Sequence, residues 1–507
     1  MPTASEVASA PCYRLLLVFK TPDDLRYVMT ATHAERASLT RGPLLRPLVR
    51  LAWPLVAIQL LQVAYNLVDT VWLGRLSADA VGALSLAFPL VFLVIAVGGG
   101  FTAAGAILIA QHTGAGGERG AGRIAGQTLG FVSLVAVAVG AFGFLVTGPM
   151  LALLPADAAT AERVVPLAAE YMRVFFLGAP ALFGFFVFTA LMRGVGDTRT
   201  PLAVMVLSVV VNVALDPFLI FGWGPFPAWG VQGAAVATVT ARGVATLAGL
   251  YVLFGTELGP TIEPRDLIPK PGPVREIVEL GVPTALEQSG TALAMVVATA
   301  MVATFPPAVV AAYGLGNRLL SLVTLPAMGL SQALDTAVGQ NLGANEPERA
   351  TRAVKLGLGL VVSVLAVVAV VVATVPEPIV SVFLPGRSEA AVATIGHAST
   401  YLRIASVAFV FFGAFQVAMG TFRGAGNTTT ALALSLVALW VVRLPATYLL
   451  AFPLGWGPTG VWTAVALGDI VGALAALAWL SRGTWKRAVI EPEPPETTTS
   501  DVVPSHD

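Results

Sequence analysis

Two acidic residues interrupt stretches of this chain that are otherwise apolar enough to cross a lipid bilayer. Asp69 lies near the end of the apolar run 51–74, and Asp216 follows Asn212 by four residues in a second run. An ionised carboxylate in the hydrocarbon region costs at least ~2.5–3.5 kcal/mol, so such a residue usually faces a bundle interior or an aqueous cavity and marks a functional site. The alternative is that each acid lies at the outer interface and stabilises the local structure of its helix.

The residues around Asp216 indicate the chemistry that it could support. Residues four apart share one face of a helix, so the Asn212 amide and the Asp216 carboxylate point in the same direction. Pro217, which follows directly, has no backbone N–H, so a carbonyl oxygen within the membrane loses its partner and the helix bends. Carboxylate, amide and carbonyl oxygens suit a hard cation or a transferred proton. The pattern therefore predicts a binding site for H⁺ or Na⁺.

The composition predicts a polytopic membrane protein. The 507 residues are 56% hydrophobic and 11% charged, whereas soluble domains carry about 25% charged residues. About 20 apolar residues span the bilayer core as one helix. We therefore expect an all-α protein with transmembrane helices over twelve runs: 50–74, 81–110, 124–147, 166–191, 200–222, 230–254, 276–304, 308–337, 354–374, 398–421, 428–452 and 459–481.

Other classes of protein find little support in the sequence. A formal net charge of zero gives no electrostatic basis for nucleic-acid binding, and the one cysteine and four dispersed histidines do not make a metal cluster. The HExxH, GxSxG and GxxxxGK motifs of metalloproteases, serine hydrolases and P-loop ATPases are missing. We therefore expect neither enzymatic activity nor a cofactor, so transport would have to use an ion gradient. A membrane-embedded enzyme and a receptor-like membrane protein are the alternatives.

The second half of the chain repeats the first at an offset of about 230 residues. Matching pairs are Pro54 and Pro283, Gln59 and Gln288, Gln111 and Gln340, Tyr171 and Tyr401, Phe185 and Phe415, Arg193 and Arg423, and Gly230 and Gly460. Because each half has an even number of helices, the halves share one orientation and should be related by a pseudo-twofold axis along the membrane normal. A duplication without functional meaning is the alternative.

The repeat and the charge distribution divide the chain into parts. We expect an N-terminal extension (1–45), an N-lobe (46–254), a linker (255–275), a C-lobe (276–482) and a disordered tail (483–507). Near the helix ends, seventeen Lys and Arg residues lie on one side and three on the other. Because cytoplasmic loops carry the excess of positive charge, both termini and the linker are predicted to be cytoplasmic.

The two halves differ in their charged residues. The position of Asp216 corresponds to Ala446, and Asp69 has no aligned acid in the second half. The second half carries Glu287 and Arg443 instead. We expect structural or gating salt bridges from Arg173, Arg318, Asp335 and Arg403, and we assign no role to Asp469.

Four motifs carry a resemblance to a known family. NLVDTVWLGRL (66–76), MRGVGDTRTPL (192–202), NVALDPFLIFG (212–222) and AVGQNLGA (337–344) resemble the MATE (multidrug and toxic compound extrusion) transporters, in particular the DinF-like branch, over residues 45–482. The resemblance implies a V-shaped pair of six-helix bundles around a central cavity. It also implies a protein of the cell membrane that exports small organic, often cationic compounds against inward H⁺ or Na⁺. Nothing in the sequence requires more than a monomer.

The resemblance also implies where the sites lie. The N-lobe cation site of that branch corresponds here to Asp69, Asn212, Asp216 and Thr238, and two such neighbouring acids could share one proton. Neutralising them from outside would let the first helix bend and release cargo. Candidate residues for the substrate cavity are Gln59, Tyr65, Phe185, Glu287, Gln288, Tyr313 and Phe415. A flippase for lipid-linked oligosaccharides or lipids, from the same superfamily, is the second interpretation.

Overall fold

The computed structural model describes residues 39–152, 158–384 and 388–490, which are helical with connecting turns. The predicted all-α fold is confirmed. The described residues contain eleven helices that are long and apolar enough to cross a membrane, or twelve spans when one bent pair counts as a single span. Most of the predicted N-terminal extension and the tail from residue 491 lie outside the described residues. So does Arg387, one of the three basic residues counted on the less positive side.

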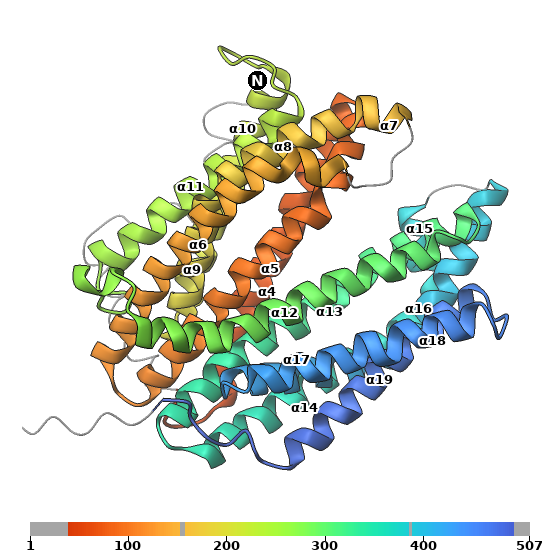
Figure 1. Ribbon diagram of the computed structural model, residues 1–507. Coiled ribbons are helices and arrows are strands. Elements are labelled where there is room, and N and C mark those ends of the chain that lie inside the picture. The colour runs from red at the N-terminus through yellow and green to blue at the C-terminus, as the bar shows by residue number, and fades with distance from the viewer. Residues whose placement is uncertain (1–38, 153–157, 385–387, 491–507) are drawn as a thin grey trace, which may run out of the picture.

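The first half of the chain forms one bundle, called the N bundle below (Figure 1). Its helices are α4 (Leu45–Leu76), α5 (Ala78–Gly114), α6 (Glu118–Ala152), the short α7 (Ala158–Arg163), α8 (Val165–Leu177), α9 (Ala179–Gly194), α10 (Arg199–Phe221) and α11 (Val231–Gly255). The predicted span 166–191 is a broken helix, because α8 and α9 are bent by 54° at Gly178. A Cβ on Gly178 would collide with Val239 of α11, so close packing requires glycine at the bend, and Pro180 just after it favours the break.

The second half forms the C bundle (Figure 1). After the 3₁₀ turn η1 (Pro264–Leu267) come α12 (Pro271–Val302), α13 (Pro307–Gly343), α14 (Pro347–Thr374), the short α15 (Pro376–Phe383), α16 (Glu389–Gly424), α17 (Thr428–Leu436), the π-helical η2 (Val437–Arg443), α18 (Leu444–Ala451) and α19 (Pro458–Ser481). The π-helical turns directly precede Pro445. A wider turn there relieves the clash that a proline ring makes with an earlier carbonyl group of a regular helix.

Helix α4 belongs to both bundles. Its first half contributes Leu48, Leu51 and Leu55 to the apolar core of the C bundle, where it packs along α13. Its second half contributes Leu73 to the core of the N bundle and packs against α10. A movement of α4 relative to α10 would therefore also change the packing between the two bundles.

The bundles meet tightly at one end, which we call the closed end. Gln111 Nε2 of α5 donates to the carbonyl oxygen of Gly424 at 3.1 Å, and Gln340 Nε2 of α13 donates to that of Gly194 at 3.0 Å. These two bonds are equivalent under the sequence repeat. Glycines at 114 and 343 let α5 and α13 approach so closely that a Cβ on either would collide with the backbone of the other helix.

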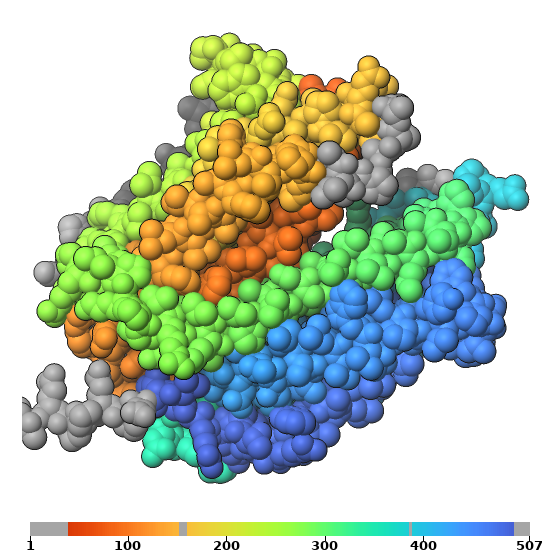
Figure 2. Space-filling view, in the orientation of Figure 1, coloured from red at the N-terminus to blue at the C-terminus, as the bar shows by residue number. Residues whose placement is uncertain are grey.

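At the opposite end, near α7 and α15, the bundles part (Figure 2). The space-filling view shows the surface hollowed between the N bundle and α12 toward this end, which we call the open end. The chain therefore forms two bundles that are sealed at one end and separated at the other.

Candidate cation site

The structure brings the four residues of the predicted cation site together. Asp69 comes from α4, Asn212 and Asp216 from α10 and Thr238 from α11, and each is at most 5% exposed. Asn212 Nδ2 donates to Asp216 Oδ1 at 3.3 Å. The carboxyl group of Asp69 lies within interaction range of the other three side chains. Three helices thus converge on one buried polar cluster.

Oxygen atoms without partners are concentrated in this cluster. Tyr65 Oη, Asp69 Oδ1, Asn212 Oδ1, Asp216 Oδ2 and Thr238 Oγ1 are buried and have no hydrogen-bond partner among the described residues. Because buried polar groups are nearly always hydrogen-bonded, five such oxygens side by side fit a proton or a hard cation that they would hold jointly. We call these five residues the N-bundle cluster.

Arg242 is a further charged residue beside the N-bundle cluster, and the sequence reasoning missed it. It lies four residues after Thr238 on α11, and its guanidinium stacks over the rings of Tyr65, at 5.1 Å, and Phe185, at 4.8 Å. It donates to Gln62 Oε1 at 2.6 Å and contacts the sulfur of Met205 at 3.3 Å. The available signal was an arginine inside an apolar run, one helical turn from a predicted ligand.

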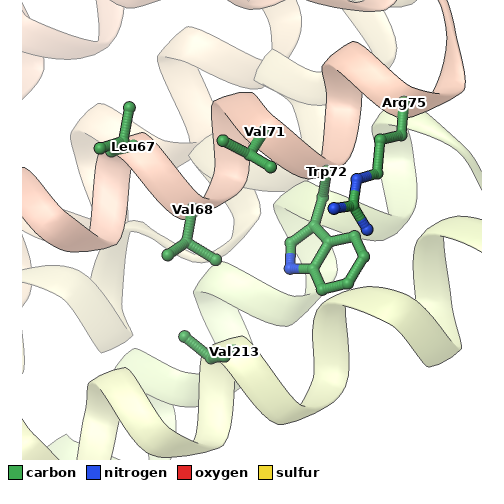
Figure 3. Close-up of a pocket in the computed structure, with 6 residues that line it drawn as sticks. All are labelled: Leu67, Val68, Val71, Trp72, Arg75 and Val213. Carbon is green, nitrogen blue, oxygen red and sulfur yellow. The ribbon is translucent and has the colours of Figure 1, made fainter. Parts of the chain in front are cut away.

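The seam between α4 and α10 has an apolar side as well. A groove of about 330 Å³ lies there. It is lined by Leu67, Val68, Val71, Trp72, Arg75 and Val213 (Figure 3). Its residues Val68 and Val213 are the chain neighbours of Asp69 and Asn212, and neither Asp69 nor Asn212 is among the residues that line it. The guanidinium of Arg75 lies 5.0 Å from the centre of the Trp72 ring at one end of the groove.

Acids in the C bundle are arranged differently. Arg423 of α16 donates to Glu287 Oε1 of α12 at 3.0 Å, and its Nε lies 3.6 Å from Asp335 Oδ1 of α13. Ser331 accepts a further hydrogen bond from Arg423 at 3.0 Å. We call Glu287, Asp335 and Arg423 the C-bundle cluster. Its two buried acids are paired with a cation that the protein itself supplies.

The three arginines also expected in salt bridges, Arg173, Arg318 and Arg403, lie on the surface. Arg403 pairs with Glu377 at 3.3 Å on the surface. Arg173 and Arg318 form no ion pair with another described residue, and both are exposed. The interaction expected of Asp335 is therefore a buried ion pair, whereas that of Arg403 is a surface pair.

The residues predicted to line the substrate cavity occupy different places. Tyr65 and Phe185 flank Arg242. Gln59 is partly buried on α4, and Gln288 faces α5 beside Gly99. Tyr313 is 5% exposed within a stack of rings with Tyr401 and Trp462, and Phe415 packs near Gly472.

Within the described residues, no three His, Cys, Asp or Glu side chains lie close enough together to hold a metal ion. A Na⁺ ion in the N-bundle cluster would therefore depend on the neutral oxygens of Tyr65, Asn212 and Thr238 beside the two carboxylates. Oxygen ligands of mixed charge are the donor set that hard cations take. The residues present fit either Na⁺ or a proton.

Comparisons with known proteins agree with the repeat. The MatE family model matches the chain twice, over residues 54–218 and 283–449. The chain is 30% identical to the probable multidrug resistance protein YoeA of Bacillus subtilis over 86% of its own length and 93% of that protein. It is also 30% identical to an FAD transporter of Shewanella oneidensis, over 69% of its length and 76% of the relative.

A solved structure shares the fold. It is described as the outward-facing conformation of a multidrug resistance MATE family transporter of the MOP superfamily. The two match with a TM-score of 0.80 and 25% sequence identity, over 88% of this chain and 98% of that one. The bundle arrangement seen here is thus one that a solved structure also adopts.

Proposed function

Because this chain belongs to the MatE family of membrane transporters, we propose that it exchanges outgoing organic compounds for inward H⁺ or Na⁺ at the N-bundle cluster. Multidrug efflux is the activity for which several of its relatives are named. The observation that carries the site is the convergence of five unpartnered oxygens from three helices in the buried centre of the N bundle. The protein is a transporter and not an enzyme.

The position of α4 suggests how the cation acts on the cleft. With both carboxylates ionised, Asp69 on α4 and Asp216 on α10 repel each other in a medium of low dielectric constant. A bound proton or Na⁺ removes that repulsion and lets α4 move toward α10. Since the other half of α4 lies in the core of the C bundle, this movement changes the contact between the bundles, narrows the cleft and releases the cargo.

The wall of the proposed cleft indicates the class of cargo. Both α4 and α12 carry exposed apolar side chains, among them Leu60, Val63, Leu286 and Leu293, and a cleft wall made of such side chains would offer area for burial and few directional contacts. Apolar burial without shape-specific hydrogen bonds gives broad specificity. We infer small organic, often cationic compounds as the cargo, with the open end facing out of the cell and both termini in the cytoplasm.

One observation favours a second candidate function. The groove between α4 and α10 is apolar and ends at the cation Arg75, which would suit a lipid chain with an anionic headgroup. Export of a lipid or a lipid-linked oligosaccharide therefore remains the alternative activity.

Transport by reconstituted protein tests the proposal. Proteoliposomes loaded with a fluorescent organic cation receive a pH gradient or a Na⁺ gradient separately, with wild type and Asp69→Asn in parallel. We expect one gradient to drive efflux from wild-type vesicles and neither to drive it in the variant. Gradient-driven efflux by Asp69→Asn at the wild-type rate would overturn the coupling site, and folded wild type that moves the probe under neither gradient would favour the flippase.

A further inference from the structure

Arg242 places a fixed positive charge beside two acids in the N bundle. Its side chain is 3% exposed, and its two described polar contacts are neutral: Gln62 Oε1 and the sulfur of Met205. It nevertheless interacts electrostatically with Asp69. An arginine keeps its proton in proteins, so this charge is present at every stage of a transport cycle.

The surroundings of Arg242 hold its charge in place. The rings of Tyr65 and Phe185 stack against the guanidinium at 5.1 Å and 4.8 Å. Gln62, which accepts its hydrogen bond, is itself tied to Asn66 of the same helix at 3.3 Å. Such packing restrains the side chain as a whole, so Arg242 acts as a tethered cation rather than as one that leaves the site.

Few other ionisable groups face the two acids. The described ones that interact with Asp69 are Asp216 on α10, Arg242 on α11, Tyr65 on α4 and Tyr171 on α8. Tyrosine hydroxyls are neutral at physiological pH. The charge of the site is therefore set by two carboxyl groups and one guanidinium.

A charge count follows from these three groups. With both acids ionised the site carries one net negative charge, and one bound proton or Na⁺ makes it neutral. With two bound protons it would carry a net positive charge that burial disfavours. Without the arginine, the neutral site would hold two protons instead of one.

From this arrangement we propose that Arg242 determines the coupling stoichiometry, so that the site takes up one monovalent cation in each transport cycle instead of two. This inference rests on the proposed function in taking the N-bundle cluster as the coupling site. Arg242 is a positioning residue in this proposal: its guanidinium sets the net charge of the site through the carboxyl groups and does not itself bind the cation. A cycle that moves one charge draws about 2.3 kcal/mol from each 100 mV of membrane potential.

At the C-bundle cluster the buried acids and the arginines beside them are equal in number. Glu287 and Asp335 contact Arg423, and Arg193 from the N bundle also interacts with Asp335 and Arg423. Two acids and two arginines are neutral together, so the C-bundle cluster with Arg193 beside it needs no further cation. The two acids of the N-bundle cluster have one described arginine beside them, Arg242, so one negative charge is left for a bound cation.

Counting protonated carboxyl groups tests the proposal without any cargo. Infrared spectra of the full-length protein in lipid nanodiscs are recorded near pH 7 in Na⁺-free buffer. The intensity of the carboxylic acid C=O stretch that disappears in the Asp69→Asn/Asp216→Asn double variant then counts the protons on this pair. Other protonated carboxyl groups cancel in the difference.

We expect one proton on the pair in wild type and about twice that intensity in Arg242→Gln. Arg242→Lys keeps the charge and should keep the wild-type count. Arg443→Gln, which removes an arginine from the C bundle, is the matched control and should also leave the count unchanged.

Two protons on the wild-type pair, or equal counts in wild type and a folded Arg242→Gln, would overturn the proposal. If Arg242→Gln does not fold, the wild-type count alone still decides between one proton and two. The proton count and the transport assay can fail separately. If the counts are as expected but the protein drives no cation-coupled transport, the proposed function is wrong while the effect of Arg242 on the charge of the site still holds.

Discussion

In the N bundle, Asp69 and Asp216 lie beside amide and hydroxyl groups, and their nearest arginine donates to Gln62. In the C bundle, Glu287 and Asp335 both contact the guanidinium of Arg423. The same six-helix repeat thus holds one pair of acids that is incompletely compensated and one that is paired. Burying an ion pair is tolerable when its partners match, whereas an incompletely compensated pair favours the binding of an external cation. Under the proposed function, the N bundle couples transport to the cation and the C-bundle cluster stabilises the fold.

The largest effect is expected from neutralising an acid in each bundle. Asp216→Asn should reduce gradient-driven efflux to the level of empty liposomes, because the remaining carboxylate is compensated by Arg242 and no longer needs a cation. Glu287→Gln is the matched change in the C bundle and should retain gradient-driven efflux. Efflux assays on both variants at equal reconstituted amounts measure this. Loss of coupling in Glu287→Gln with full coupling in Asp216→Asn would reverse the comparison.

Removing the internal cation of the C-bundle cluster should act on stability. Arg423→Met removes the arginine that contacts both buried acids and leaves, among the described arginines, only Arg193 near Asp335, and breaking a buried pair in this way costs about 3–5 kcal/mol. We expect a large drop in the thermal unfolding temperature in detergent, with recovery when Glu287→Gln and Asp335→Asn are added. Arg403→Met, which removes only a surface pair, should cost at most about 1 kcal/mol. An unchanged unfolding temperature in Arg423→Met would show that the pairing is not structural.

The closed end should respond to the loss of either hydrogen bond between the bundles, each worth about 0.5–1.5 kcal/mol. Gln340→Ala removes the bond to Gly194, whereas Gln111→Ala removes the bond to Gly424 and also the bonds that Gln111 Oε1 accepts from Val489 N at 2.8 Å and Ile490 N at 3.3 Å. We therefore expect a larger effect from Gln111→Ala than from Gln340→Ala, and at least about a tenfold increase in the opening of this end in the double variant. Accessibility of a cysteine introduced at Gly117 to a thiol reagent, in a Cys12→Ser background, measures the opening. A larger effect from Gln340→Ala would contradict this ranking.

A third acid, outside the bundles, should give the smallest effect. Asp266 of η1 accepts hydrogen bonds from Arg119 of α6, and this contact lowers the pKa of the carboxyl group. A lowered pKa means that the stabilisation is complete above the ordinary range near pH 4 and is lost as the pH falls below it. We expect Asp266→Asn to lower the unfolding temperature modestly at pH 7 and to match wild type in strong acid. A larger difference in acid than at pH 7 would contradict this sign.

Much of this architecture could be predicted from the sequence, since it depends on local pattern. The length and apolarity of the runs predicted the spans, and the offset of about 230 residues predicted the two bundles. The fourth span was harder to predict, because the bend at Gly178 depends on the approach of Val239 from another helix. The π-helical turns before Pro445 likewise depend on how a helix accommodates one proline within its bundle.

The candidate site divides in the same way. Asn212 and Asp216 share a helix face at a spacing that the sequence shows directly, and the structure brings Asp69 and Thr238 to them. The partner of Glu287 could not be predicted, because Arg423 is distant in sequence and reaches it from α16. Arg242 was missed because its importance depends on two rings, from α4 and α9, that only the tertiary fold brings to it.

The central claim is that the N-bundle cluster, and not the C-bundle cluster, links cation loading to the separation of the bundles. Spin labels on Ala161→Cys and Ala390→Cys, at the open end of the N bundle and the C bundle, report that separation in a Cys12→Ser background. We predict that acidification or Na⁺ shortens the label distance in wild type and in Glu287→Gln but leaves it unchanged in Asp69→Asn. A cation-dependent distance that persists in Asp69→Asn and disappears in Glu287→Gln would contradict the account.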